Sequence, residues 1–442
     1  MSERLVNVDR ETPMLLPVDL REWVPEDDLV HFVISAVETM NLPALTVNQR
    51  GSGSRQYPPR MMLALVIYCY ANGLMSSRRI ERATYRDLGV RYLTGDTHPD
   101  HDTICAFRRE NGYVIKQAFL ELLRLARQMG LLTVGTVSVD GTHIKANASK
   151  HKSLRYDRAG ELERLLLKDI EELLARAEKS DNESSGDEQK LPGEIARREA
   201  LLEKMRWARA ELENRAKSGQ EPLQDEKGSG EKGSGPTSGA SASGKPEASQ
   251  QINLTDADSA LMRKSRRDSY EQAYNAQAVV DVGDSRLILG TDVLRTPSDA
   301  NQLSAAVCSV DKSLGRVQRL LADGGYVNAE AIEEVGQTVD LYIAITHEDN
   351  SHRRYDYRPP KDSPAKKVTD PRLVAMREKV TGEEGKRIYA QRACTVEPVF
   401  GTVKAALGLR QFLMRGLQRV RIEWDLACLA YNTRRLWGLS RA

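Results

Sequence analysis

The middle of the chain carries the feature that most limits how it can fold: a segment from Ser218 to Gln251 in which Gly, Ser, Lys and Glu predominate. This segment, which includes the run GSGEKGSG, is too poor in apolar residues to contribute to a hydrophobic core. We predict that it is a flexible, disordered linker. Apolar patterns lie on both sides of it, so a compact core can combine sequence that precedes the linker with sequence that follows it.

Three acidic residues stand in settings that are typical of catalytic side chains. Asp140 ends an alternating run with Val137 and Val139, which predicts a strand, and a glycine follows it. Asp323 ends the apolar run LLA and precedes two glycines, which permit a tight turn from a strand into a helix. Glu397 opens a stretch whose apolar residues have the spacing of one helical face. Carboxylate oxygens suit Mg²⁺, and a pair of metal ions suits phosphoryl transfer, so phosphodiester chemistry is the leading hypothesis.

Four segments carry a resemblance to a known family. They are DGTHIKANAS from Asp140, YNAQAVVD from Tyr274, LADGGY from Leu321, and YAQRACTVEPVFGTVK from Tyr389 to Lys404. In this order, with an acid at each expected place, they resemble the DDE transposases of bacterial insertion sequences, which are members of the RNase H-like integrase superfamily. The resemblance covers most of the chain.

The resemblance implies an α/β fold class, with an RNase H-like catalytic core, an all-helical N-terminal domain, and a helical and disordered insertion. We expect residues 1–130 to form a helical DNA-binding domain and residues 131–442 to form the catalytic domain. A helical hairpin and the Gly/Ser-rich linker should interrupt the catalytic domain at 155–260. Pattern alone indicates only an α/β protein.

The resemblance also implies the residues of the site. Asp140, Asp323 and Glu397 would be the catalytic residues and would hold two Mg²⁺ or Mn²⁺ ions. Lys404 follows Glu397 by seven positions, as in the family, which is nearly two helical turns, so the two side chains should share a face and Lys404 should reach a phosphate. Tyr389 and Arg392 are further DNA-binding candidates, although the spacing from Arg392 to Glu397 is one residue longer than the commonest form. Pro398 predicts that the helix starts near Thr395 or kinks there.

The N-terminal part supplies the other DNA-binding candidates. The net charge is only +2, but Lys and Arg outnumber Asp and Glu from Arg55 to Gly130 and from Lys386 to Ala442, whereas acids prevail from Asp157 to Asp258. Two basic ends suit an enzyme that contacts phosphates, although solvated helix faces would look the same. By resemblance, the stretch from Ser76 to Asn111 should bind the terminal inverted repeats. The candidates are Arg78, Arg79, Arg82, Arg86, Arg108 and Arg109.

Periodicity predicts the elements around these sites. Apolar stripes predict an antiparallel helical pair in the insertion, one helix with Leu162, Leu165, Leu166, Ile170, Leu173 and Leu174 and the other with Ile195, Leu202, Met205 and Leu212. After the linker we expect two antiparallel strands joined at VGDS, a helix over 299–314, a helix near 328–335, a strand from Asp340, and a last helix over 423–437. The segment 347–370 is predicted to be a mobile loop that contacts DNA.

Composition indicates where in the cell the protein works and which cysteine chemistry it lacks. The five cysteines of the 442-residue chain are scattered and lack any C-x-x-C pair, so neither a disulfide framework nor a zinc site is indicated. The N-terminus has no apolar segment typical of a signal peptide, and no apolar run is long enough to span a bilayer. We therefore expect a cytoplasmic bacterial protein that associates with the nucleoid when it binds DNA.

These observations predict a DNA transposase that binds the terminal inverted repeats of an insertion sequence and catalyses Mg²⁺-dependent strand cleavage and strand transfer. Its partners would be double-stranded DNA, both transposon ends and target, and further copies of itself on that DNA. Two alternatives remain open. One is a nuclease that uses the same acids without joining strands, and the other is an inactive relic that acts as a DNA-binding repressor.

Overall fold

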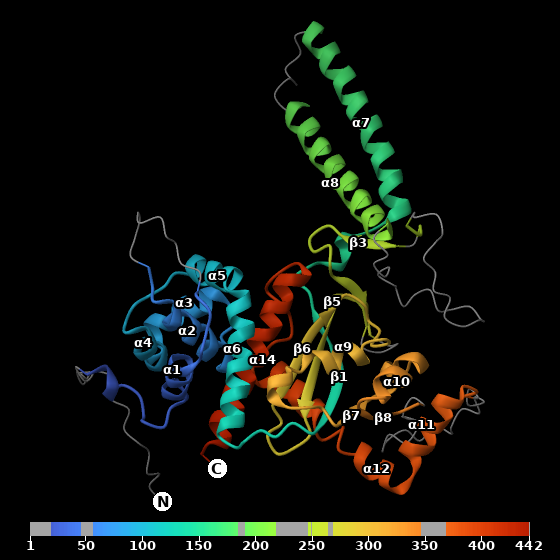
Figure 1. Ribbon diagram of the computed structural model, residues 1–442. Helices are drawn as coiled ribbons and strands as arrows, with labels where there is room; N and C mark the ends of the chain where they lie inside the picture. Colours follow the sequence, from blue (N-terminus) through green and yellow to red (C-terminus); the bar gives the residue numbers. More distant parts are fainter. Residues whose placement is uncertain are drawn as a thin grey trace, which may run out of the picture.

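A computed structural model describes residues 19–45, 56–183, 191–217, 246–248, 250–263, 268–345 and 368–441, with side chains 177–191 excepted. Figure 1 shows a group of N-terminal helices, a central sheet with its own helices, and a long helical hairpin that rises from them. The predicted α/β class is confirmed. Most of the predicted linker over 218–251 and most of the predicted DNA-contacting loop over 347–370 lie outside the described residues, namely 218–245, 249 and 347–367. The described ends of these two segments include Gln251, which begins β3, and Asp370, which caps α11.

Six α-helices make up the described part of the N-terminal region, which was predicted to be helical. An aspartate caps α1, α4 and α5 by accepting a hydrogen bond from a backbone N–H in the first turn, and Pro59 occupies the first position of α2. Helix α2 is buried from Met62 to Ala71 and forms the centre of this group. The bounds are α1 (Leu29–Thr39), α2 (Pro59–Ala71), α3 (Ser77–Arg86), α4 (Leu88–Thr94), α5 (His101–Glu110) and α6 (Gly112–Gln128).

A six-stranded mixed sheet lies at the centre of the molecule. Its strands are β1 (Thr136–Lys145), β4 (Ala260–Met262), β5 (Glu271–Asp281), β6 (Ile288–Leu294), β7 (Arg319–Ala322) and β8 (Asp340–Ile343). The order is β4-β5-β1-β7-β8, and β6 pairs with β5. Strand β1 is antiparallel to β5 and parallel to β7, which is parallel to β8. The antiparallel pair β5 and β6, the β7 strand and the β8 strand were all predicted.

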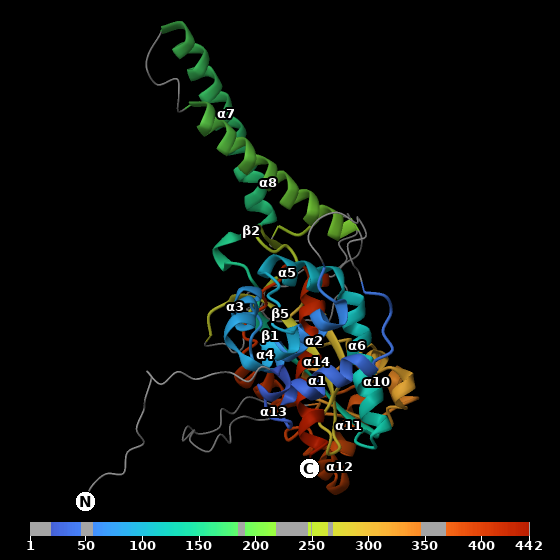
Figure 2. The same cartoon turned by 90° about the vertical axis from the view of Figure 1, so that its left-hand side faces the viewer.

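Helices connect and cover these strands. They are α9 (Leu303–Ser309), α10 (Ala329–Gly336), α11 (Pro371–Thr381), α12 (Glu383–Tyr389), α13 (Val396–Gly401) and α14 (Leu417–Leu439). The short strands β2 (Ser153–Arg155) and β3 (Gln251–Asn253) pair at the base of the hairpin formed by α7 (Tyr156–Glu183) and α8 (Leu191–Lys217). Figure 2 shows α7 and α8 side by side, well away from the rest of the molecule.

Three predicted boundaries are wrong. Asp140 does not end a strand, because β5 continues to pair with β1 as far as Lys145 and keeps it extended. The helix expected over 299–314 is reduced to α9 and a 3-10 turn, and Asp299 lies in the loop before α9. The last helix begins at Leu417, six residues earlier than predicted, directly after Gly416, whose φ of 83° ends the preceding turn.

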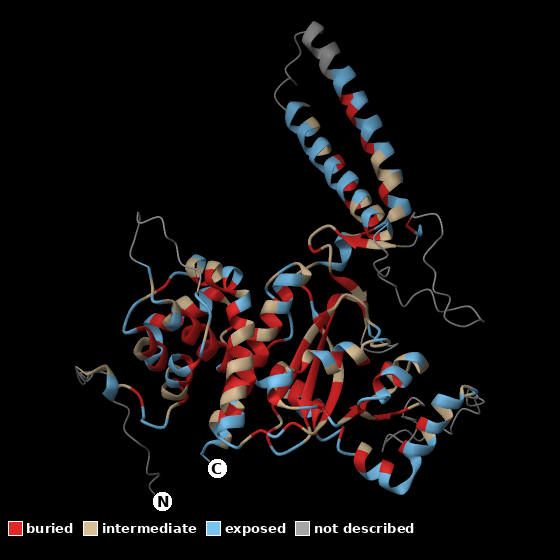
Figure 3. Cartoon of the chain, viewed as in Figure 1, coloured by how far each residue is buried: buried red, intermediate tan, exposed pale blue. Residues whose placement is uncertain are grey.

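One hydrophobic core joins the N-terminal helices to the sheet. It includes residues of α2 and α6 on one side and of β1, β5 and β7 on the other, and buried residues of α14 such as Trp424 and Leu429 lie between them (Figures 1 and 3). The hairpin has a separate, smaller core that includes Leu166, Ile170 and Met205. Leu165 and Leu174, which were predicted to share its buried stripe, are exposed. Within the described part of the chain, no helix combines the length and apolarity that a membrane span requires.

Candidate active site

Strands β1 and β7 bring Asp140 and Asp323 to the same level of the sheet. The two strands are parallel, and their last paired residues are Ser138 and Leu321. Each aspartate lies two residues beyond that pair, where β1 and β7 are no longer paired. The acids therefore face the space that opens as the two strands separate, although their positions are 183 residues apart in the chain.

Asp323 also caps the turn that follows it. Its Oδ1 accepts a hydrogen bond of 2.9 Å from the Gly325 N–H, at the start of the 3-10 turn η5 (Gly324–Tyr326). A Cβ at Gly325 would lie 3.0 Å from that same oxygen, so a side chain there would press on the carboxylate. Close approach of the carboxylate therefore favours glycine at position 325 of the predicted tight turn.

Arg392 lies among the three predicted acids. Its guanidinium donates to Asp140 Oδ2 at 3.0 Å and lies 3.6 Å from Asp323 Oδ2 and 3.8 Å from Glu397 Oε1. Arg392 belongs to the segment between α12 and α13, and Glu397 belongs to the first turn of α13. The three acids from two strands and one helix thus converge on a single cation.

The solvent exposure of the side chains increases from Arg392 and Asp140 to Glu397. Only 7% of the Arg392 side chain and 15% of Asp140 are exposed, compared with 38% of Asp323 and 61% of Glu397. Burial raises the pKa of Asp140 to about 7; the positive charge of Arg392 opposes this effect, and the negative charge of Asp323 adds to it. The site thus has a buried acidic floor and an open side at Glu397, where a long substrate could approach.

The three acids offer the type of ligand atom that a divalent cation prefers. Carboxylate oxygens are the ligands that Mg²⁺ and Mn²⁺ prefer, and the three acids already face one positive group. Within the described ranges, however, no three acidic, His or Cys side chains are gathered closely enough to enclose an ion. Arg392 occupies the point on which the carboxylates converge, so it would have to give up part of these contacts when a metal binds.

Comparisons with known proteins give the family. Residues 18–110 match a transposase domain (DUF772), and residues 364–437 match a transposase DDE domain. These matches indicate a DDE transposase. No curated protein and no solved structure matches the chain. The second matched segment of the transposase contains Arg392, Glu397 and Lys404, whereas Asp140 and Asp323 lie between the two matched segments.

Lys404 of the transposase lies against β1, beside the acidic cluster. Its ammonium group donates to Thr142 Oγ1 at 2.5 Å and to the His143 carbonyl at 2.9 Å. The prediction that one regular helix joins Glu397 to Lys404 is wrong, because α13 changes into a π-helix, η7, over Thr402–Ala406. The predicted start near Thr395 is confirmed, since α13 begins at Val396 and holds Pro398 in its first turn.

The other DNA-binding candidates differ in position. Arg78, Arg79, Arg82 and Arg86 are exposed on α3, and Arg109 is exposed at the end of α5. Arg108 is only 3% exposed, and its guanidinium donates to the Tyr70 hydroxyl and the Met75 carbonyl. It holds the helices together and is removed from the candidate set. Tyr389, the last residue of α12, is partly buried against the main core.

Sequence reasoning missed four residues that surround the acids. Asn275 and Gln277 of β5 donate to Asp299 in the loop after β6, and Gln277 accepts from the Tyr326 hydroxyl. The available signal was the pair of amide residues at alternate positions next to the alanines and valines of a strand, because buried polar side chains need partners. No local pattern marks Asp299 as a site residue, because the sequence around it predicts a helix over 299–314 whereas Asp299 lies in the loop before α9.

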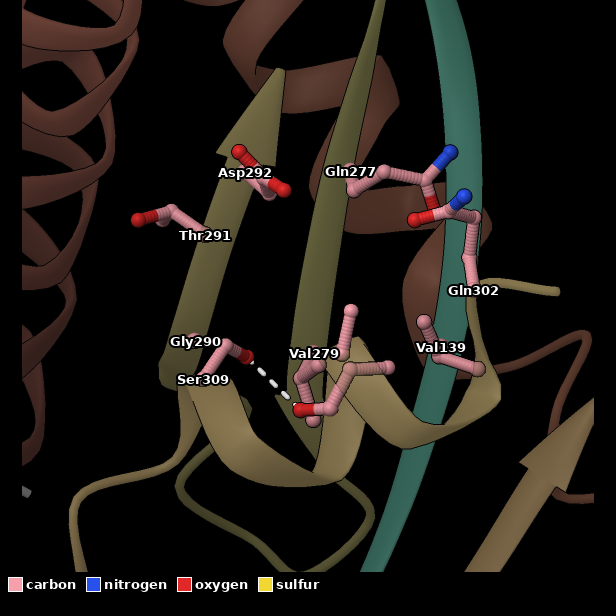
Figure 4. A pocket seen from close by; sticks show the side chains of 10 residues that line it. Val139, Gln277, Val279, Gly290, Thr291, Asp292, Gln302 and Ser309 are labelled. Atoms are coloured by element: carbon pink, nitrogen blue, oxygen red, sulfur yellow. Dashed lines mark hydrogen bonds between the residues drawn. The ribbon is translucent and has the colours of Figure 1, made fainter. Parts of the chain in front are cut away.

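The nearby cavity is too small for a ligand. Figure 4 shows it between β5, β6 and α9, with Gln277, Val279 and Ser309 in its lining. Its volume of about 10 Å³ is close to that of a single water molecule. A larger hollow of about 620 Å³ runs beside α12 and is lined in part by Arg286 and Arg387. Neither hollow is lined by Asp140, Asp323 or Glu397.

Proposed function

We propose that this protein is a DNA transposase that binds the terminal inverted repeats of an insertion sequence, cuts the strands at its ends and joins them to target DNA. The observation that carries the proposal is the convergence of Asp140, Asp323 and Glu397 on one guanidinium group. Groups of acids that face a single cation are suited to divalent metal ions and to phosphodiester chemistry. The two transposase matches support the same function.

We further propose that the catalytic part has the RNase H-like fold. Strand β1 carries the first acid, and the antiparallel strands β5 and β6 follow it in the chain. Helix α9 then leads to β7, which carries the second acid and pairs in parallel with β1. The third acid lies on the late helix α13. This order of acids, strands and helices is the one that the family resemblance predicts.

Asp140, Asp323 and Glu397 would hold two Mg²⁺ or Mn²⁺ ions. Such ions, when bound, polarise the phosphate and increase the acidity of the attacking hydroxyl. The chain's own groups hold these carboxylates in place: the Gly325 N–H fixes Asp323, and the Arg392 guanidinium fixes Asp140. Arg392 can then exchange carboxylate contacts for a phosphate of the DNA, since guanidinium binds both groups in the same way.

Cleavage and joining follow the same bond changes. A water oxygen attacks the phosphorus at the end of the element, the P–O3′ bond breaks, and the 3′ oxygen leaves as a hydroxyl. That hydroxyl then attacks a target phosphodiester, so one P–O bond forms for each one broken. Lys404 beside β1, together with Tyr389 and Arg392, would contact the phosphates near the acids, while α3 would contact the inverted repeats. Two copies of the chain, each on one end, would form the working assembly.

The test combines binding, cleavage and joining on DNA that carries the inverted repeats flanking the gene. Asp140→Ala, Asp323→Ala and Glu397→Ala should each abolish cleavage and joining in Mg²⁺ and leave end binding nearly unchanged, because the acids contribute little to phosphate affinity. Asp340→Ala is the matched control, since Asp340 pairs with Arg319 at 3.1 Å at the start of β7 and β8, whereas Asp323 follows the end of β7. Full cleavage by any acid variant would refute the assignment. Cleavage without joining by wild type would favour the nuclease alternative, and end binding without cleavage would favour the repressor.

A further inference from the structure

Asp299 is a fourth acid beside the cluster. It lies in the loop between β6 and α9, and its Oδ1 accepts hydrogen bonds from Asn275 Nδ2 at 2.7 Å and Gln277 Nε2 at 2.6 Å. The two amides stand at alternate positions of β5, opposite His143 and Gly141 of β1. Asp299 therefore joins the loop after β6 to the same stretch of sheet that carries Asp140.

Two glycines leave the space that the Asp299 carboxylate fills. A Cβ at Gly141, next to Asp140, would lie 2.6 Å from Asp299 Oδ1. A Cβ at Gly325, two residues after Asp323, would lie 3.2 Å from Asp299 Oδ2. Asp299 Oδ1 thus faces the backbone at Gly141, and Asp299 Oδ2 faces the backbone at Gly325. A side chain at either glycine would push the Asp299 carboxylate away.

A chain of side chains leads from Asp299 to the turn that holds Asp323. Because Asp299 accepts from the amide nitrogen of Gln277, the amide oxygen of Gln277 is left facing the Tyr326 hydroxyl, which donates to it. Tyr326 is fully buried and is the last residue of the turn that Asp323 caps. The orientation of one amide therefore couples the loop after β6 to the position of Asp323.

We infer that Asp299 is a positioning residue of the active site, which orients Gln277 and, through Gln277 and Tyr326, holds the turn that carries Asp323. The inference rests on the proposed function, because it assigns Asp299 a part in the same acidic site. Groups that orient metal-binding side chains from behind commonly change metal affinity or activity about 10- to 100-fold when removed. Asp299→Ala should have an effect of this size.

The experiment measures Mn²⁺ binding by calorimetry and Mg²⁺-dependent cleavage of end DNA on the full chain. In Asp299→Ala, we expect Mn²⁺ affinity and kcat each to fall about 10- to 100-fold, with KM for DNA nearly unchanged. Asp299→Asn keeps an oxygen that can accept from both amides, so it should recover much of the loss. Asp340→Ala, a change at the opposite end of the β7–β8 pair, should behave like wild type. If Asp299 acted only on folding, the substitution would lower the melting temperature but would not lower kcat at an unchanged KM.

A double-mutant cycle tests the proposed chain of contacts. Tyr326→Phe should weaken Mn²⁺ binding, and adding it to Asp299→Ala should cost less than the sum of the two changes, because both act on one network. Wild-type Mn²⁺ affinity and kcat in Asp299→Ala, or strictly additive effects, would overturn the inference. If Asp299→Ala does not fold, Gln277→Leu takes its place in the cycle with Tyr326→Phe, because it removes the link between Asp299 and Tyr326. Wild-type protein that neither binds Mn²⁺ nor cleaves DNA would instead overturn the proposed function.

Discussion

Arg392 shows how one residue can determine the electrostatics of a site. Its guanidinium is almost fully buried and lies within 4 Å of three carboxylates, and only the contact with Asp140 is short enough to be a hydrogen bond. A buried arginine with acidic partners lowers the cost of burying both charges. Removal of Arg392 would leave the Asp140 carboxylate buried beside other acids. Arg392 therefore stabilises the acidic cluster even when no DNA is bound.

Lys404 allows a prediction at the same scale. If its ammonium group reaches a DNA phosphate, Lys404→Ala should slow cleavage, weaken end binding to a similar extent for different sequences, and make the salt dependence of binding shallower by roughly one unit. Lys404→Arg should keep part of the activity, because the charge persists. Electrophoretic binding assays over a range of salt concentrations measure this, with Lys312→Ala as a control for an exposed lysine in the 3-10 turn before β7.

The opposite result has a clear structural meaning. Unchanged cleavage and an unchanged salt slope in Lys404→Ala would show that Lys404 does not contact DNA. Its hydrogen bonds to Thr142 and to the His143 carbonyl would then serve to hold η7 against β1, and the variant should have a lower melting temperature.

Glu423 supports a prediction about pH. This residue of α14 is fully buried, and its carboxylate accepts from the backbone N–H groups of Leu413 and Met414. Burial raises its pKa above the ordinary value of 4.5, so folding favours the protonated form. The stability that this group contributes is therefore full below about pH 4.5 and is lost as pH rises through the folded pKa.

Glu423→Gln, which resembles the protonated acid, isolates this effect. The free energy of unfolding of the variant minus that of wild type should become more positive as pH rises from 4.5 through the folded pKa of Glu423, by about 1.4 kcal/mol for each unit of pKa shift. Urea unfolding at several pH values measures the difference, and Glu383→Gln, at the exposed start of α12, controls for loss of a charge. A difference that is the same at every pH would contradict the assignment.

Single elements show how one sequence pattern can serve two purposes. Helix α3 buries Ile80, Ala83 and Thr84 and exposes its arginines on the other side. Arg78, Arg82 and Arg86 are four residues apart, so they form a row along the exposed face. Such a row can follow a phosphate backbone. Arg108 lies two helices further on and carries the same charge, yet it is enclosed by the same group of helices.

These two kinds of arginine should respond differently to substitution. Changing Arg78, Arg82 and Arg86 to Ala should leave folding intact, weaken end binding, and reduce the salt slope by up to roughly three units. Arg108→Met should lower the free energy of unfolding by about 1–3 kcal/mol, because the Tyr70 hydroxyl and the Met75 carbonyl lose their buried partner. Binding assays and urea unfolding on both variants test this. Weaker DNA binding by correctly folded Arg108→Met would restore Arg108 to the candidate set.

The parts of the molecule are defined by its hydrophobic cores and not by the order of segments along the chain. Helix α14, near the C-terminus, packs between the N-terminal helices and the sheet, so residues from both ends of the chain form one core. The hairpin of α7 and α8 has its own core and stands apart. Only the hairpin should therefore be removable as a unit.

Excision of the hairpin tests this division. Residues Arg155 and Gln251 are paired across β2 and β3, so a short Gly/Ser turn can replace residues 156–250. With Leu154 and Ile252 changed to Ser, since both would lose their cover, the remaining protein should unfold cooperatively with a melting temperature close to that of wild type and should still cleave DNA. Removal of residues 1–130 should instead prevent folding, because it exposes α14. A folded chain without residues 1–130, or loss of folding on hairpin excision, would contradict the division.

Local patterns in the sequence determined the elements. Alternation predicted β1, β5 and β6, the two glycines predicted the turn after Asp323, and 3.6-residue periodicity predicted the hairpin. These features depend on neighbours within a few residues, so the residues themselves specify them. The position of Asp140 within β1 was not predicted, because it depends on how far β5 pairs beyond it.

Only the tertiary structure decided which groups meet. Arg392 and Asp140 are 252 positions apart, and no local pattern relates them. The same is true of Asp299 and the amides of β5, and of the burial of Arg108 by Tyr70, which lies 38 residues away. The chain therefore encoded the acids of the site through local signals. The arginine among those acids and the network behind Asp323 arise from contacts between distant segments, because buried charges and amides must find partners wherever packing brings their elements together.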